Sequence, residues 1–151
     1  MGFGVSGSAA IIFLGVLVCT GTLYTAAAGS AEQLTDARHA NDERILEQRN
    51  TDIDVASATY TGNESTSYTV NFQIENTGAT TLSVNDTSVL LNNEYVDPSQ
   101  FDVAEVDDDG TTDVWAPGQT LHLQYMTDEK PETVKVVTAY GVSDTNATVV
   151  N

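Results

Sequence analysis

The chain has 151 residues, of which 22 are acidic and five are basic, so its formal net charge is −17. Phosphate binding requires clustered cations, and this charge balance therefore excludes nucleic acid as a partner. The one cysteine, Cys19, excludes an intramolecular disulfide, and the fold must be held together by packing. Dispersed acid with only two lysines is typical of proteins from concentrated salt, in which the repulsion between carboxylates is screened.

The first segment of the chain is free of charge. No Asp, Glu, Lys, Arg or His occurs before Glu32, and the stretch from Val5 to Ala28 consists of apolar and small residues. A helix needs about 20 such residues to cross a bilayer. Tyr24 lies near the far end, where an aromatic ring suits the membrane interface. We predict a membrane-anchor helix over residues 1–30, by which the chain is tethered to the cell membrane.

Other interpretations of this segment stay open. A secretory signal has a basic start and a small-residue cleavage site; Ala26 to Ala28 supply such a site, but no basic residue precedes the apolar run. A pilin-type leader also requires a basic residue. Lipidation of Cys19 is disfavoured because Val18 occupies a position at which a small residue is needed. The pattern favours an uncleaved anchor.

Residues 31–51 are polar, lack Pro and Gly, and are rich in helix-forming residues. Their apolar stripe is too thin for an independent helix. A helix that continues from the anchor needs no new nucleation, and we therefore predict a helical stalk. A disordered linker is the alternative.

From residue 52 onward the apolar residues alternate with a period of two. Tyr68, Val70, Phe72 and Ile74 share one face of the clearest predicted strand. Further strands are expected over 53–60, 81–84, 89–91, 94–96, 101–106, 121–125 and 132–142, with a two-residue turn at Asn92–Asn93. This spacing predicts an all-β immunoglobulin-like sandwich over residues 52–151. The Cys–Trp–Cys pattern of antibody domains is absent, and Trp115 is expected near a loop.

No pattern indicates an enzyme, a metal site or a cofactor. His39 and His122 are far apart in the sequence, and neither has a second ligand at the usual spacing. The acidic run Asp107–Gly110, with Glu105 before it, resembles the start of a calcium loop. Counted from Glu105, Ala116 occupies the position of the bidentate glutamate. We interpret the run as a solvated acidic turn.

Two sets of residues are candidates for contact with the surroundings. Asn63, Asn85 and Asn146 each begin an N-glycosylation motif, all in predicted turns, which favours a location outside the cytoplasm. Leu91, Tyr95 and Val96 lie on the short predicted strands around Asn92–Asn93 and are candidates for a protein-contact edge. The alternative is that these three residues complete the core of the sandwich.

The opening MGFGVSGSAAIIFLGVLVCTGTLYTAA, the polar stalk and the stretches NTGATTLSV, WAPGQTLHL and ETVKVVTAYGVSD together resemble the haloarchaeal FlaF family of archaellum accessory, or stator, proteins. The resemblance covers essentially the whole chain. It implies a single-pass membrane protein whose sandwich lies outside the cytoplasm and binds surface-layer protein. It also implies a FlaG-type partner, and a homodimer as in similar domains.

Two expectations compete with this interpretation. Arg38, Arg44 and Arg49 follow the apolar segment, and the positive-inside rule alone would place them in the cytoplasm. A folded domain is translocated largely regardless of charge, and we therefore predict the outward orientation. The alternative function is a FlaG-like or archaellin-like filament subunit, whose apolar helix packs in a core of identical helices.

Overall fold

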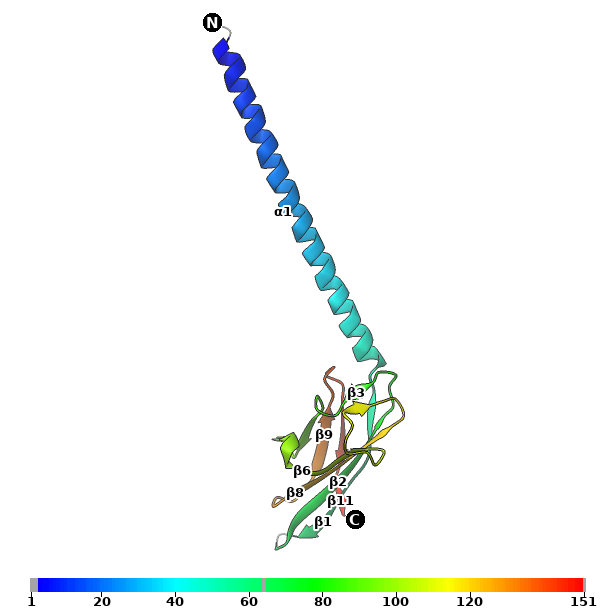
Figure 1. Cartoon of the computed structure of the whole chain (residues 1–151). Helices are drawn as coiled ribbons and strands as arrows, with labels where there is room; N and C mark the ends of the chain where they lie inside the picture. Colours follow the sequence, from blue (N-terminus) through cyan, green and yellow to red (C-terminus); the bar gives the residue numbers. More distant parts are fainter. Residues whose placement is uncertain (1–2, 64, 151) are drawn as a thin grey trace. The chain divides into compact units, whose positions relative to one another are not determined.

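The computed structural model describes residues 3–63 and 65–150 (Figure 1). Met1 and Gly2 of the predicted anchor, and Glu64 in the first glycosylation motif, lie outside the described residues. The chain divides into two compact units, Met1–Glu43 and Arg44–Asn151. The predicted boundary between anchor and stalk falls within a single helix, and it stays a prediction.

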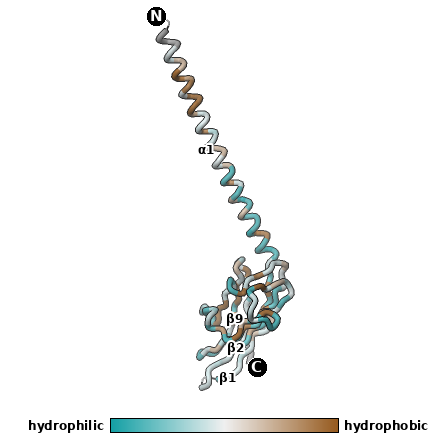
Figure 2. The backbone as a smooth tube through the Cα atoms, viewed as in Figure 1, coloured by the Kyte–Doolittle hydropathy of each residue, from teal (hydrophilic) through white to brown (hydrophobic). Residues whose placement is uncertain are grey.

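One continuous helix, α1 (Phe3–Asn50), contains 48 residues, as expected for an anchor that continues into a stalk. Its first part is apolar and its later part is polar (Figure 2). The large apolar side chains from Ile11 to Tyr24 are 59–75 % exposed. The hydroxyls of Thr20, Thr22 and Thr25 donate to carbonyl oxygens three or four residues earlier. These polar groups are therefore satisfied within the helix, as a lipid environment requires.

The rest of the chain is a β-sandwich, which confirms the predicted fold. The larger sheet has the strand order β11 (Val149–Val150), β1 (Ile53–Asn63), β2 (Ser67–Asn76), β8 (Thr120–Thr127), β6 (Phe101–Val106). The smaller sheet has the order β10 (Ser143–Ala147), β9 (Thr133–Val137), β4 (Ser88–Leu91), β5 (Glu94–Val96). A further pair consists of β3 (Leu82–Ser83) and β7 (Val114–Trp115), and a 3-10 turn, η1, spans Pro98–Gln100. All pairs are antiparallel except β1 with β11.

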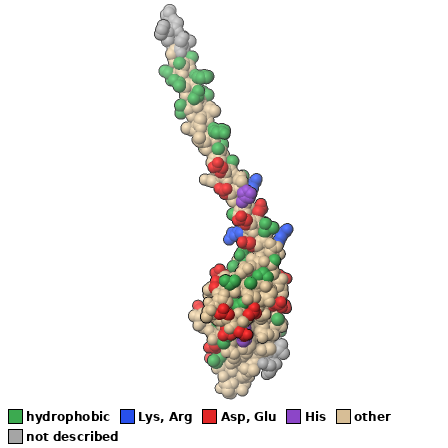
Figure 3. Space-filling view, turned by 45° about the vertical axis from the view of Figure 1, so that its right-hand side comes forward, with side chains coloured by type: hydrophobic (Ala, Val, Ile, Leu, Met, Phe, Trp, Pro, Cys, Tyr) green, Lys and Arg blue, Asp and Glu red, His purple; other side chains and the backbone are tan. Residues whose placement is uncertain are grey.

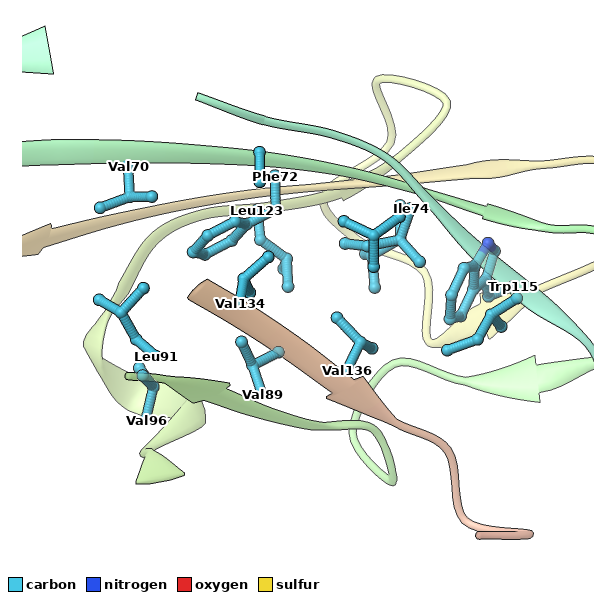
Figure 4. Close-up of a cluster of buried hydrophobic side chains, with 14 of the residues drawn as sticks. Val70, Phe72, Ile74, Val89, Leu91, Val96, Trp115, Leu123, Val134 and Val136 are labelled. Atoms are coloured by element: carbon cyan, nitrogen blue, oxygen red, sulfur yellow. The ribbon is translucent and has the colours of Figure 1, made fainter. Parts of the chain in front are cut away.

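The alternation predicted for the clearest strand is confirmed in β2. Val70, Phe72 and Ile74 are fully buried, whereas Gln73 is exposed. The three buried side chains belong, together with Leu123, to the core that both sheets share (Figure 4). The core residues of β4, β5 and β9 are Val89, Leu91, Val96, Val134 and Val136.

One expectation about the C-terminal half was wrong in its extent. The strand predicted over 132–142 ends at Val137 as β9, because the chain turns at Gly141 with φ 79° and Thr138 N–H donates to Val142 O at 2.9 Å before β10 begins at Ser143. Trp115 lies near a loop as expected, since it ends β7 directly before the turn at 116–119, but its full burial was not predicted. A strand of two residues is too short to show alternation, and the sequence pattern could not reveal its burial.

One side of the sandwich is closed by side chains of β10. A bulge in β1 between Val55 and Ser57 interrupts the regular pairing with β2. Val55 N–H donates to Asp144 Oδ2 at 2.8 Å, and Asn146 Nδ2 donates to Val55 O at 2.8 Å. These bonds join β1 of the larger sheet to β10 of the smaller sheet.

Candidate functional site

The last turn of α1, which belongs to the second compact unit, is fastened to the sandwich by the loop after β2. The last carbonyls of a helix have no partner within the helix. Here Asn50 O accepts from Ala79 N–H at 2.7 Å and from Thr80 N–H at 3.2 Å. Glu47 O accepts from the Thr51 hydroxyl at 2.7 Å and from the Thr80 hydroxyl at 3.4 Å. The helix end is thus capped by the sandwich.

Asn76 organises the loops behind this cap. Its side-chain Nδ2 donates to Thr80 O at 2.9 Å and to Trp115 O at 3.0 Å, and its Oδ1 accepts from Gly78 N–H at 3.2 Å. Its backbone N–H donates to Gln119 O, which also accepts from the indole N–H of Trp115. Asn76 is fully buried, so these bonds satisfy polar atoms that would otherwise be costly to bury.

Gly78 lets the loop after β2 approach the end of α1 closely. Its amide donates to Asp52 O at 2.9 Å, and a Cβ placed on it would lie 2.6 Å from Asn50 O. No side chain fits at that separation. We call Asn50, Asn76, Gly78, Trp115 and Gln119 the junction cluster.

Sequence reasoning missed this cluster. The stretches that contain all of it except Asn50, NTGATTLSV and WAPGQTLHL, entered the sequence analysis only as part of the family resemblance. The signal available was their composition, since Asn, Gly and Gln in turns offer side-chain and backbone hydrogen bonds. Their convergence on the end of α1 could not be deduced from spacing alone.

The three residues of the predicted contact edge lie in two different environments. β5 is an edge strand of the smaller sheet, and Tyr95 is 56 % exposed. Leu91 and Val96 are buried in the core. Asn92 and Asn93 have φ of 53° and 67°, as the predicted two-residue hairpin turn requires.

The edge of β5 offers little backbone for pairing. In a two-residue hairpin the residues that flank the turn exchange hydrogen bonds, so Leu91 and Glu94 pair and the backbone of Tyr95 points away from β4. Pro98 ends the strand directly afterwards. A partner strand could therefore bond to one residue only, and contact here must rest on side chains. Beside the edge lies a cavity of about 300 Å³, lined in part by Tyr95, Tyr125 and Asp128.

The acidic run forms a tight turn. Asp107 and Asp108 have φ of 49° and 71°. Asp107 Oδ1 accepts from Thr120 N–H at 3.0 Å, and Asp109 Oδ1 accepts from the hydroxyl of Thr111 at 2.7 Å. The hydroxyl and the amide of Thr111 hold the pKa of the Asp109 carboxyl below its ordinary value. Within the described residues, no group of three His, Cys, Asp or Glu side chains could hold a metal ion. His39 lies on α1 and His122 on β8.

The three glycosylation motifs lie in different surroundings. Asn85 is exposed in the turn after β3, and Asn63 is the last residue of β1, where its Oδ1 accepts from Ser65 N–H. Asn146 was expected in a turn, but it lies in β10. Its side chain bonds to Val55 because β10 pairs with β9 and turns Asn146 toward the bulge in β1. Glycosylation of any of the three stays a prediction.

A long N-terminal helix with an uncharged first part, which leads directly into a β-sandwich, is typical of β-domain proteins that are tethered to a membrane. The profile of the archaeal-type flagellin family matches residues 2–148. The chain belongs to this family, which confirms the expected relationship to the archaellum. No curated protein matches the chain.

Three solved structures show more distant likeness. The archaellum periplasmic stator protein FlaG from Sulfolobus acidocaldarius is 20 % identical over 64 % of this chain and 98 % of that chain, with a TM-score of 0.44. The archaellum periplasmic stator protein complex of FlaF and FlaG from the same organism is 18 % identical over 63 % of this chain and 86 % of that chain, with a TM-score of 0.42. A GH20 exo-β-N-acetylglucosaminidase from Vibrio harveyi is 7 % identical over 68 % of this chain and 18 % of that chain, with a TM-score of 0.38. At these scores the likeness carries no conclusion about function.

Proposed function

We propose that this protein is an archaellum accessory protein that acts as a stator. The apolar part of α1 anchors it in the cell membrane, and the sandwich lies outside the cytoplasm and holds the surface layer. The observation that carries the proposal is the fastening of the helix end, since Asn50 O accepts from both Ala79 N–H and Thr80 N–H. A stator must transmit force from the domain that binds the surface layer to the segment in the membrane. A helix end that is hydrogen-bonded to the sandwich can transmit this force, whereas a flexible linker could not.

The apolar surface of α1 supports the membrane part of this proposal. The helix is long and apolar enough to cross a bilayer, and its large apolar side chains from Ile11 to Tyr24 are exposed. The outward orientation rests on the glycosylation motifs and on the family resemblance, against the positive-inside rule. Surface-layer protein, a FlaG-type protein and a second copy of the chain are the proposed partners.

Orientation is tested by labelling a cysteine on the sandwich in intact cells. Glu129 is exposed, so we choose Glu129→Cys with Cys19 replaced by Ala. A membrane-impermeant maleimide should label this variant before lysis. Labelling only after lysis would show that the sandwich faces the cytoplasm.

The stator role is tested in cells that carry only residues 1–51. These cells should assemble archaella poorly or swim poorly, whereas cells with the full chain carrying Gln73→Ala should swim normally. Normal motility of cells with the truncated chain would remove the stator hypothesis.

A filament subunit is the second candidate. Membership of the archaeal-type flagellin family favours it, and the exposed apolar surface of α1 between Ile11 and Tyr24 suits packing among identical helices. The mass of the protein isolated from cells separates the two candidates. Retention of Met1 or Gly2 supports the anchor, and removal of a short leader supports the filament subunit.

A further inference from the structure

The outer face of the smaller sheet differs from the rest of the surface. Residues 51–151 contain 17 acidic residues and two lysines, and acidic side chains are spread over the face of the sandwich in Figure 3. The core side chains of β4, β5 and β9 in Figure 4 occupy the inner face of this sheet. Alternation places their neighbours along each strand on the opposite, outer face.

One row of residues crosses all four strands on that outer face. The register pairs Tyr95 with Leu90, Leu90 with Lys135, and Lys135 with Thr145. The next row contains Val137 between Ser88 and Ser143. The other outward positions of the four strands are Thr and Ala. We call this surface the Lys135 face.

No carboxylate occupies an outward position of these four strands. Asp144 pairs with Val136 on the inner side, where its carboxylate accepts from Val55 N–H, and Glu94 pairs with the buried Leu91. Asp97 follows the end of β5, and its carboxylate is bonded to the hydroxyl and amide of Ser99. An acid-free face is unusual on a domain with a formal charge of −15.

Lys135 is one of the two cations of the sandwich, and it lies near the centre of this face. Its side chain is half-buried between Leu90 and Thr145, and its ammonium group has no hydrogen-bond or ion-pair partner in residues 3–63 and 65–150. Tyr95 and Val137 add apolar surface around it. The face therefore offers a single unpaired charge surrounded by apolar and neutral side chains.

The outer face of the larger sheet is different in character. Gln73 and Gln124 lie there and bond to neighbouring side chains, Ser57 at 3.2 Å and Asn71 at 2.9 Å. The side chains of Gln73 and Gln124 therefore have partners within the sheet, and Glu105 lies at its edge. This face provides matched control positions.

We propose that the Lys135 face is the surface by which the sandwich binds its partner, and that the partner is an acidic protein that offers a carboxylate among apolar side chains. In molar salt the Debye length is about 3 Å, so exposed charges attract weakly. An ion pair covered by apolar groups is screened far less, and an ammonium group that is buried without a counter-charge is costly. The single lysine in an apolar surround thus selects a partner with a matching carboxylate. The inference rests on the proposed function, in that it names the surface used for holding.

The test uses the full chain in detergent and purified surface-layer protein at molar chloride. Lys135→Gln should weaken binding at least roughly tenfold, and Lys135→Glu should weaken it further, because the partner's carboxylate is left unpaired or repelled. Gln73→Glu changes the net charge by the same amount as Lys135→Gln but lies on the other sheet, and its binding should match that of the wild type. Tyr95→Ser, which leaves the charge unchanged, should also weaken binding.

The outcomes separate this inference from the proposed function. Absence of binding by the wild type would contradict the stator proposal itself. Wild-type binding that is unchanged in both Lys135→Gln and Tyr95→Ser would leave the stator proposal standing and overturn the Lys135 face. Self-association that Lys135→Glu abolishes, with surface-layer binding intact, would also overturn it, because a second copy would then occupy the face.

Discussion

The side-chain amide of Asn76 donates to the carbonyl of Trp115 at 3.0 Å, and through this bond the turn after β2 is joined to β7. The same amide donates to Thr80 O, next to Ala79, whose N–H caps the end of α1. The end of the helix and the core around the tryptophan therefore depend on one buried side chain. The first prediction follows from this dependence.

Asn76→Ala should destabilise the sandwich by about 2–4 kcal/mol, because it leaves buried carbonyls unsatisfied and opens a small cavity. Trp115 is the one tryptophan of the chain and is buried, so its fluorescence during denaturant unfolding measures the change. Asn85→Ala is the matched control, since Asn85 is exposed, and it should stay within about 0.5 kcal/mol of the wild type. Equal stability of the two variants would contradict the role given to Asn76.

Gly78→Ala should loosen the end of α1. The added Cβ would lie 2.6 Å from Asn50 O, so the backbone must move and the bonds from Ala79 and Thr80 to Asn50 must lengthen. Hydrogen exchange at the amides of Ala79 and Thr80 should become faster. Gly110→Ala is the control, because its Cβ would meet the flexible Glu105 side chain at 3.3 Å. Unchanged protection of both amides would show that the cap does not depend on Gly78.

The burial alternation of β2 gives a third prediction. Phe72→Ala and Ile74→Ala should each cost roughly 2–5 kcal/mol, because both side chains are fully buried. Gln73→Ala should be nearly neutral, since its side chain lies on the exposed face. Thermal unfolding measures all three. A large loss for Gln73→Ala with small losses for its neighbours would place the strand in the other register.

How well each element could be predicted from sequence depended on the length of its pattern. β2 and β8 are long enough to show alternation between a buried and an exposed face. The hairpin at Asn92–Asn93 was predictable because few residues other than Gly and Asn accept positive φ. The continuous helix α1 followed from the absence of Pro and Gly after the apolar segment, since elongation needs no new nucleus.

The candidate sites were harder to predict, since they arise from contacts between distant segments. Asn50, Asn76 and Trp115 meet only when the loops after α1, β2 and β7 converge. Lys135 gains its significance from Leu90 and Thr145 on neighbouring strands. For Leu91 and Val96, the pattern marked an edge but could not show that both side chains turn inward.

A fourth prediction concerns Asp97. Hydrogen bonds from the hydroxyl and the amide of Ser99 hold the pKa of this carboxyl below its ordinary value. The fold thus favours the ionised form, so the stabilisation is present at neutral pH and is lost as the pH falls through the lowered pKa. Ser99→Ala should raise the pKa of Asp97, as measured by NMR titration. Asp109, which Thr111 holds low in the same way, should be unaffected and is the control.

The last prediction concerns salt. Residues 51–151 have a formal charge of −15, and their 17 carboxylates are balanced by only two lysines. In dilute buffer the Debye length grows from about 3 Å to 10 Å or more, and repulsion among these groups then opposes the compact state. The melting temperature of the sandwich, followed by Trp115 fluorescence of the full chain in detergent, should therefore fall as chloride is withdrawn from molar to dilute levels. Lys135→Gln removes one positive charge and Gln73→Glu adds one negative charge. Each variant should make the melting temperature depend slightly more steeply on the chloride concentration. A melting temperature that is the same in dilute and in molar chloride would contradict the halophilic interpretation.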